Sequence, residues 1–165
     1  MIILRRRAAA LLATCTVLAP VPALAAYDCS VSVVGVNFGV YDPVVAQPDD
    51  SAGRVEVTCN NIGGGVDNVA YNIALSPGLA GSFSPRRLVF GPARLDYNLF
   101  RNAGRTEVWG NGTSGSFPVS GSMRVGPGQG NRTRTNTHDI FGRVPAQQDA
   151  AVGTYSDTIV VTVTF

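Results

Sequence analysis

The last seven residues of the chain, IVVTVTF at positions 159–165, show the strict alternation that is typical of a β-strand. Its more apolar side carries Ile159, Val161, Val163 and Phe165, and its other side carries one valine and two threonines. Alternation alone leaves open which side faces the core. No turn and no returning strand follow in this sequence. Because an apolar strand with a free edge promotes aggregation unless something covers it, we expect a partner on that edge.

Runs of the same two-residue period fill the preceding sequence, and clusters of Gly, Pro, Asn and Asp separate them. Nothing in the sequence is typical of a long helix. The runs are CSVSVVGVNFG, GRVEVTC, NVAYNIALS, RLVF, LDYNLF, GSFPVSGSMRV and DIFGRVP. With the terminal run they predict about eight short strands in one all-β domain, an antiparallel β-sandwich.

Three of these runs predict a clear core face. The predicted core residues are Val55, Val57, Cys59, Val69, Tyr71, Ile73, Leu75, Leu95, Tyr97 and Leu99. Gly35 shifts the alternation within the first run and predicts a bulge or a strand switch there. The polar stretch GPGQGNRTRTNT at positions 126–137 is predicted to be a loop.

The N-terminus has the three parts of a secretory signal peptide. The basic MIILRRR precedes the apolar AAALLATCTVLAPVPALA, which ends in the small-x-small site of residues 23–25. We expect cleavage between Ala25 and Ala26, so that residues 1–25 are the signal peptide and residues 26–165 the folded domain. A transmembrane anchor is disfavoured, because Pro20 and Pro22 interrupt the end of the run and no basic stop-transfer segment follows.

Removal of the signal peptide changes the charge balance. Three of the thirteen basic residues lie in it, which leaves ten arginines against eleven acidic residues and no lysine. The basic character of the full sequence is therefore mostly a targeting feature, and the domain has no support for nucleic-acid binding.

Two cysteines, Cys29 and Cys59, remain in the expected mature chain. An oxidising compartment favours a disulfide between them, closing a loop of about thirty residues and contributing roughly 3–4 kcal/mol to stability. Two cysteines and one histidine, His138, are too few for a zinc site, so we predict neither a metal nor a cofactor.

The sequence offers no positive support for catalysis. His138 is the only imidazole, and beside Asp139 at a loop-to-strand edge it is predicted to be a solvated loop residue. No G-x-S-x-G elbow is present, and no carboxylate pair is indicated by spacing. Arg132 and Arg134 in the polar stretch are capable of binding anionic glycans, although a solvated loop is the default interpretation.

Four segments together resemble one known family. They are CSVSVVGVNFGVYDP, GRVEVTC, LDYNLFRNAGRTEVWGNGT and FGRVPAQQDAAVGTYSDTIVVTVTF, and they span almost the whole expected mature chain. The most specific parts are the block from Tyr97-Asn98-Leu99 to Trp109-Gly110 and the Gly153-x-Tyr155-x-Asp157 lead-in to the last strand. The chain resembles the spore coat protein U family, whose members are secreted subunits of archaic chaperone–usher pili.

This resemblance implies an antiparallel immunoglobulin-like β-sandwich that lacks its final strand. In such pili a periplasmic chaperone lends the missing strand, and a neighbouring subunit replaces it at the outer-membrane usher by β-augmentation. It also implies a groove between the first and last strands. We expect one wall to contain Ile159, Val161, Val163 and Phe165, and the other to contain Val31 and Val33.

The chain departs from the pattern of a polymerising subunit at its N-terminus. After cleavage at Ala25, only three residues precede Cys29, too few to span a neighbour's groove at about 3.3 Å per residue. We therefore expect a non-catalytic pilus or coat subunit that accepts a donor strand and gives none, at the fibre tip or released. It would pass through the periplasm to the cell surface without a stable membrane anchor. The alternative is a free-standing secreted glycan-binding β-sandwich.

Overall fold

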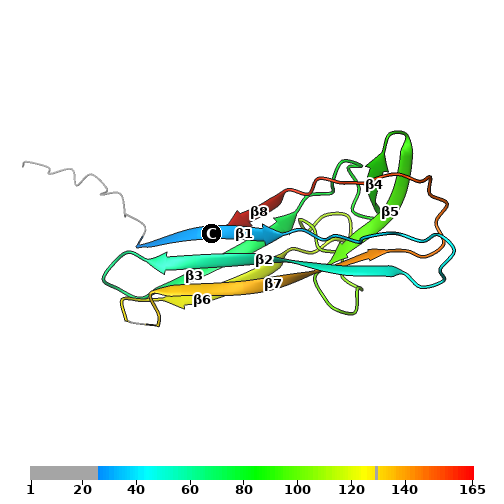
Figure 1. Ribbon diagram of the computed structural model, residues 1–165. Coiled ribbons are helices and arrows are strands. Elements are labelled where there is room, and N and C mark those ends of the chain that lie inside the picture. The colour runs from blue at the N-terminus through cyan, green and yellow to red at the C-terminus, as the bar shows by residue number, and fades with distance from the viewer. Residues whose placement is uncertain (1–25, 129) are drawn as a thin grey trace, which may run out of the picture.

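The computed structural model describes residues 26–128 and 130–165, so the predicted signal peptide lies outside the described residues. Two antiparallel sheets pack face to face (Figure 1). The five-stranded sheet has the order β1 (Tyr27–Val34), β2 (Asp49–Asn61), β7 (Thr133–Val144), β5 (Ala93–Phe100) and β4 (Arg86–Phe90). The three-stranded sheet has the order β6 (Val119–Val125), β3 (Asp67–Leu75) and β8 (Val161–Thr164). These are the only named elements of the described residues, and none is a helix.

The predicted all-β fold and its core are confirmed. All ten core residues predicted from alternation are at most 4% exposed. They come from β2, β3 and β5, which lie inside their sheets with neighbours on both sides. Trp109, in the connection from β5 to β6, is also fully buried, and its indole N–H donates to the Ile73 carbonyl at 3.0 Å. The core therefore lies between the sheets.

The loop predicted for residues 126–137 is wrong over its second half, because β7 begins at Thr133. Residues 133–137 pair with the end of β2. Threonine is β-branched and fits a strand with a solvent-facing side, and the hydroxyls of Thr135 and Thr58 lie 2.8 Å apart across the pair. The polar residues of this stretch are exposed to solvent, as expected, but they belong to a strand and not to a loop.

Two strand ends differ from the predictions. β1 ends at Val34, one residue before Gly35, and the chain then leaves the sheet while Val36 and Phe38 still pack against the core. The terminal strand begins at Val161 and not at Ile159. Before it, Val160 is held by Ser76, whose N–H donates to the Val160 carbonyl and whose hydroxyl accepts from the Val160 N–H, both at 2.9 Å.

Cys29 and Cys59 form the predicted disulfide. The two residues are directly opposite in the β1–β2 ladder, and Cys59 is fully buried. Because β1 has no other strand partner among the described residues, this bond is the covalent link that holds the edge strand to its sheet.

We predict that Cys29→Ser with Cys59→Ser lowers the free energy of unfolding by about 3–4 kcal/mol, since the bond closes a loop with a sequence separation of 30. Periplasmic yield and thermal unfolding of the double variant check this. Unchanged yield and melting temperature would show that the ladder alone holds β1.

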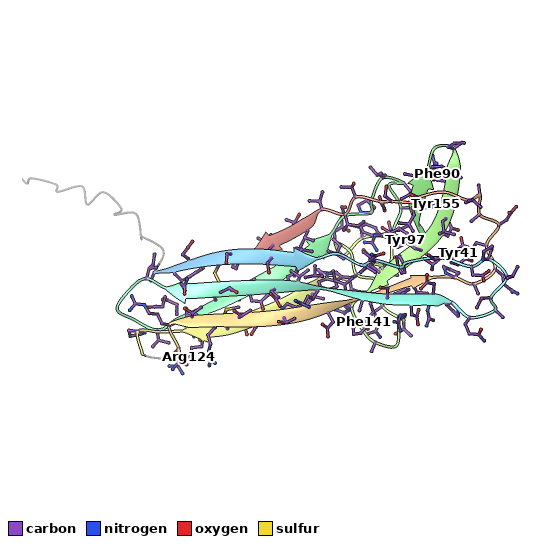
Figure 2. The ribbon with its side chains drawn as sticks, viewed as in Figure 1. Tyr41, Phe90, Tyr97, Arg124, Phe141 and Tyr155 are labelled. Atoms are coloured by element: carbon purple, nitrogen blue, oxygen red, sulfur yellow. A yellow bond between two sulfur atoms is a disulfide. The ribbon has the colours of Figure 1, made fainter. Side chains whose placement is uncertain are left out.

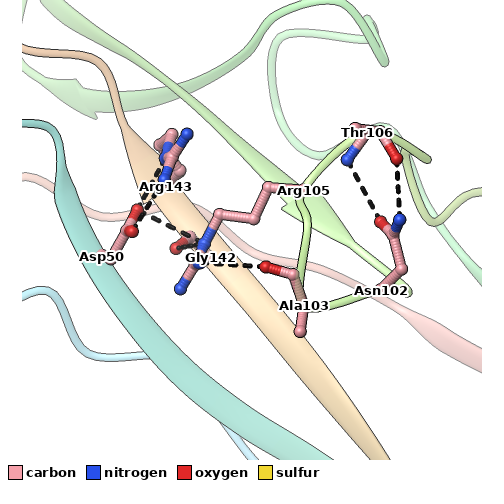
Figure 3. A network of polar contacts seen from close by, with 7 residues as sticks. All are labelled: Asp50, Asn102, Ala103, Arg105, Thr106, Gly142 and Arg143. Carbon is pink, nitrogen blue, oxygen red and sulfur yellow. Dashed lines mark hydrogen bonds and ion pairs between the residues drawn. The ribbon is translucent and has the colours of Figure 1, made fainter.

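A polar cluster fixes the β5–β6 connection to the five-stranded sheet (Figure 3). Asp50 accepts two hydrogen bonds from Arg143 at 2.7 and 2.8 Å, and Arg105 approaches the same carboxylate at 3.3 Å. Arg105 also lies 5.9 Å from the centre of the Phe141 ring. The hydrogen bonds from Arg143 hold the pKa of Asp50 below its usual value. The cluster therefore joins three segments far apart in the sequence.

Candidate functional site

The edges of the two sheets face each other along one side of the sandwich. β1 is the edge of the five-stranded sheet and β8 is the edge of the three-stranded sheet (Figure 1). β1 pairs only with β2, and β8 only with β3, in the part of the chain that the structure describes. Each edge strand therefore has one side without a β-ladder partner.

The pairing register shows which side chains of β1 face inward. Val31 is opposite Val57 and Val33 is opposite Val55, and both of these β2 residues are fully buried. Because directly paired residues share a face of the sheet, Val31 and Val33 point toward the core. They are nevertheless 40% and 48% exposed. The rest of the described chain therefore leaves the inward side of β1 partly uncovered.

The pairing register of β8 shows in the same way which of its side chains face inward. Val163 is opposite the fully buried Ile73, and Val161 is opposite Leu75, so both valines face inward. Phe165 continues this alternation, and its ring centre lies 6.1 Å from that of Tyr71. Phe165 is 49% exposed. The more apolar of the two sides of the terminal run is thus the inward one.

A groove of about 820 Å³ begins where the two edge strands face each other and continues between the segment that follows β1 (35–43) and the segment that leads into β8 (150–159). Val33 lies on one wall, and Ile159 and Val161 lie on the other. The groove reaches the core, since its lining includes these residues of both sheets: Leu75, Leu88, Leu95, Tyr97, Leu99, Ile140 and Val144. A space that is open to solvent and lined by core side chains therefore runs into the sandwich.

The segment that leads into β8 lines one part of the groove. The Asp157 carboxylate accepts from the Tyr97 hydroxyl at 2.6 Å and from the Leu79 N–H at 2.8 Å. Burial, and then the hydrogen bond to Asp157, raise the pKa of Tyr97, which keeps the phenol neutral. Tyr41 and Tyr155 also line the groove, and they lie on the same side of the molecule as Tyr97 (Figure 2). Asp157 thus fixes where the last segment crosses to the three-stranded sheet.

A buried arginine sets the start of β8. Arg86 is fully buried, and its guanidinium donates to the Ser76 carbonyl at 2.9 and 3.1 Å and to the Trp109 carbonyl at 2.7 Å. It also donates to the side-chain oxygen of Asn98 at 2.9 Å, and it lies 5.1 Å from the centre of the Phe83 ring. Burial lowers the pKa of Arg86 to about 10. Since Ser76 in turn binds Val160, Arg86 positions one wall of the groove from inside the core.

His138 lies in β7, so its predicted place in a solvated loop is wrong. It is directly opposite the buried Val55 and faces inward. Its Nε2 lies 2.9 Å from the Tyr71 hydroxyl, which also accepts from the Asn136 side-chain amide at 2.9 Å. Tyr71 satisfies both contacts when it donates to a neutral His138. Burial lowers the pKa of His138, and the nearby Asp139 opposes that shift.

We predict that the fold becomes less stable as the pH falls below about 6.5, the ordinary value for histidine. The pKa of His138 is lower in the folded state, so the unfolded chain binds a proton first, and stability is lost through the window down to the folded value. Thermal unfolding of wild type and His138→Gln at several pH values checks this. If both proteins have the same pH dependence between 6.5 and 5, His138 is not the responsible group.

The predicted groove residues lie on the two facing edges, and they divide into two sets. Val33, Ile159 and Val161 line the groove itself. Val31, Val163 and Phe165 are outside its lining, further along the same inward faces. The sequence did not indicate that core residues such as Leu88, Ile140 and Val144 also line the groove, although it predicted Tyr97 and Leu99 as core residues. Val36 and Phe38 also line the groove, and their alternation after Gly35 was the available signal.

Among the described residues there is neither a metal-binding cluster nor a membrane-spanning helix. No group of three or more His, Cys, Asp or Glu side chains is placed to hold a metal ion within residues 26–128 and 130–165. Over the same ranges, no helix is long and apolar enough to cross a membrane.

Comparison with known proteins identifies the family. The sequence model of the Spore Coat Protein U domain matches residues 11–162. The chain belongs to the spore coat protein U domain family. The resemblance found in the sequence is thus confirmed. Protein U of Myxococcus xanthus is 28% identical over 137 residues, which cover 79% of this chain and 71% of that protein.

A solved structure supports the fold. It is the crystal structure of the CsuC–CsuE chaperone–tip adhesion subunit pre-assembly complex from the archaic chaperone–usher Csu pili of Acinetobacter baumannii. One of its chains matches with a TM-score of 0.51 and 22% identity, over 84% of this chain and 40% of that chain. This chain therefore spans well under half of the matched one. The immunoglobulin-like sandwich expected from the family is the fold observed.

Proposed function

We propose that this member of the spore coat protein U domain family is a non-catalytic structural subunit of a chaperone–usher pilus or surface coat. A strand from another protein completes its sandwich. The observation that carries the proposal is the exposure of inward-facing Val31, Val33 and Phe165 at two facing sheet edges. Family membership and the fold shared with a chain of a chaperone–pilus subunit complex support the same function.

The chemistry of the groove fits an extended peptide. A strand inserted between β1 and β8 receives main-chain hydrogen bonds from both edges, and its alternate side chains enter the groove. The lining is largely aliphatic and aromatic. The donor segment should therefore alternate apolar and polar residues, with the apolar set facing Leu75, Leu95 and Leu99. This chemistry includes neither a cofactor nor a catalytic residue.

We further infer that the chain accepts a donor strand and does not supply one. β1 begins at Tyr27, and the carbonyl of Ala26 already accepts from the N–H groups of Ile62 and Gly63 at 2.8 and 3.0 Å. The chain from Ala26 onward is thus engaged in its own sandwich. If the leader is removed between Ala25 and Ala26, no segment remains to donate. N-terminal sequencing of the exported protein tests this inference, and a retained leader of ten or more residues would overturn it.

The partners that follow from this function are a periplasmic chaperone, an outer-membrane usher and neighbouring pilus subunits. The protein would pass through the periplasm and end at the cell surface or outside the cell. Expression in the periplasm with and without the chaperone tests the function. We expect a soluble one-to-one complex with the chaperone, and aggregated or strand-swapped protein without it. A folded, soluble monomer in the absence of the chaperone would favour the free-standing glycan-binding module instead.

A further inference from the structure

Two buried glycines lie on the inward face of the five-stranded sheet, close to the point where the chain leaves β1. Gly53 of β2 is directly opposite the buried Ile140, and Gly142 of β7 is directly opposite the buried Leu99. Because directly paired residues share a face of the sheet, both glycines face inward. They are diagonal neighbours on adjacent strands. The sheet therefore has two adjoining inward positions that carry no side chain.

The segment that follows β1 lies directly on these two positions, and we call residues 34–38 the crossing segment. A Cβ atom added at Gly53 would lie 2.5 Å from the Val34 carbonyl oxygen and 3.1 Å from one methyl of Val36. A Cβ atom added at Gly142 would lie 2.7 Å from the other methyl of Val36 and 2.8 Å from the tip of the Phe38 ring. These separations are well short of the roughly 3.5–4.0 Å at which non-bonded carbon atoms pack. The crossing segment could not keep this position if either glycine were replaced.

Further contacts carry the crossing segment over the sheet. The Ser51 hydroxyl of β2 donates to the Asn37 carbonyl at 2.6 Å. The Phe38 ring then packs edge-on against Tyr97 of β5, with the ring centres 5.9 Å apart. The segment therefore crosses the inward faces of β2 and β7 and reaches β5. Along this path Val36, Asn37 and Phe38 line the groove, so the crossing segment is one of its walls.

We propose that Gly53 and Gly142 are positioning residues for the capture of a donor strand. A side chain at either position would push the crossing segment off the sheet and toward residues 150–159, which line the other side of this part of the groove. Neither glycine lines the groove itself, so both act through the crossing segment. This inference rests on the proposed function, because it concerns the width of the space that the donor enters.

The test measures co-purification of each variant with the tagged periplasmic chaperone. We expect Gly142→Ala to reduce capture about tenfold or more, since the added carbon forces the crossing segment into the groove. Gly53→Ala should show the same loss. Gly142→Ala combined with Val36→Ala should restore capture to within about threefold of wild type, because the nearest methyl is removed and the tip of the Phe38 ring can turn aside.

Two controls separate this effect from the substitution itself and from a loss of stability. Gly64→Ala should leave capture within about twofold, since nothing lies within 4 Å of its added Cβ. Val69→Ala empties part of the core outside the groove lining. It should lower the melting temperature of the chaperone complex but leave capture within about threefold.

The outcomes separate this inference from the proposed function. Equal capture of wild type and Gly142→Ala would overturn the inference alone. So would failure of Val36→Ala to restore capture, or an equal loss of capture in Val69→Ala. Absence of wild-type capture would overturn the proposed function and this inference with it.

Discussion

A single carboxylate on the inward face of β8 should abolish capture of a donor strand. We expect Val163→Asp to reduce co-purification with the chaperone by about a hundredfold or more, because strand insertion would bury an unpaired charge. Val163 faces inward opposite the fully buried Ile73, at the edge where the donor must lie. Val161→Asp should behave in the same way, since Val161 lines the groove directly.

The neighbouring residue of the same strand supplies the control. Thr162 is exposed and lies on the outward face, so Thr162→Asp adds the same charge one residue away without entering the groove. It should leave capture within a few-fold of wild type. Affinity purification of the tagged chaperone, with quantification of both proteins in the periplasmic extract, measures the effect. Normal capture of Val163→Asp would disprove the assignment of this face to the groove.

The second large effect is expected at Arg86. Arg86→Ala should lower the free energy of unfolding by about 3–5 kcal/mol, because it leaves the Ser76 and Trp109 carbonyls without their donor and removes one of the two donors to the Asn98 side-chain oxygen. Ser76 also holds Val160, so the change should disturb the start of β8 as well as the core. A fall of about 10 °C in the melting temperature of the chaperone complex corresponds to this loss.

Two further variants make the Arg86 result interpretable. Arg86→Lys keeps the charge but cannot donate to three acceptors in the same plane, so it should recover only part of the stability. Arg94→Ala removes an exposed arginine of the same β-hairpin and should change stability by no more than about 0.5 kcal/mol. If Arg86→Ala melts within a few degrees of wild type, the buried guanidinium does not organise this end of the groove.

The two-residue periodicity predicted the core because β2, β3 and β5 are buried on one face only. Val55, Tyr71 and Leu95 illustrate this, since the residues on either side of each are polar or small and face away from the core. Periodicity could not predict which strands become edges. That depends on the long-range order β1-β2-β7-β5-β4 and β6-β3-β8, in which chain neighbours are often not spatial neighbours.

The polar residues that shape the groove were the hardest to predict. Arg86 is an arginine in a short strand, and nothing local distinguishes it from the adjacent exposed Arg87. Its role follows from contacts with Ser76 and Trp109, which the fold brings together from distant segments. His138 was misplaced for the same reason, because its hydrogen-bond partner Tyr71 is 67 residues away in sequence. Hydrophobic patterns are local signals, whereas buried polar networks are set by tertiary structure.

We propose that a strand from another protein fills the space between β1 and β8. Amide hydrogen exchange in the purified chaperone complex tests it most directly, because the free edge of β6 in the same molecule serves as an internal reference. We predict slow exchange along both β1 and β8, on the sides that face the groove, and fast exchange along the outer edge of β6. If the β1 and β8 edges exchange as fast as the β6 edge, the groove is empty in the complex and the account is wrong.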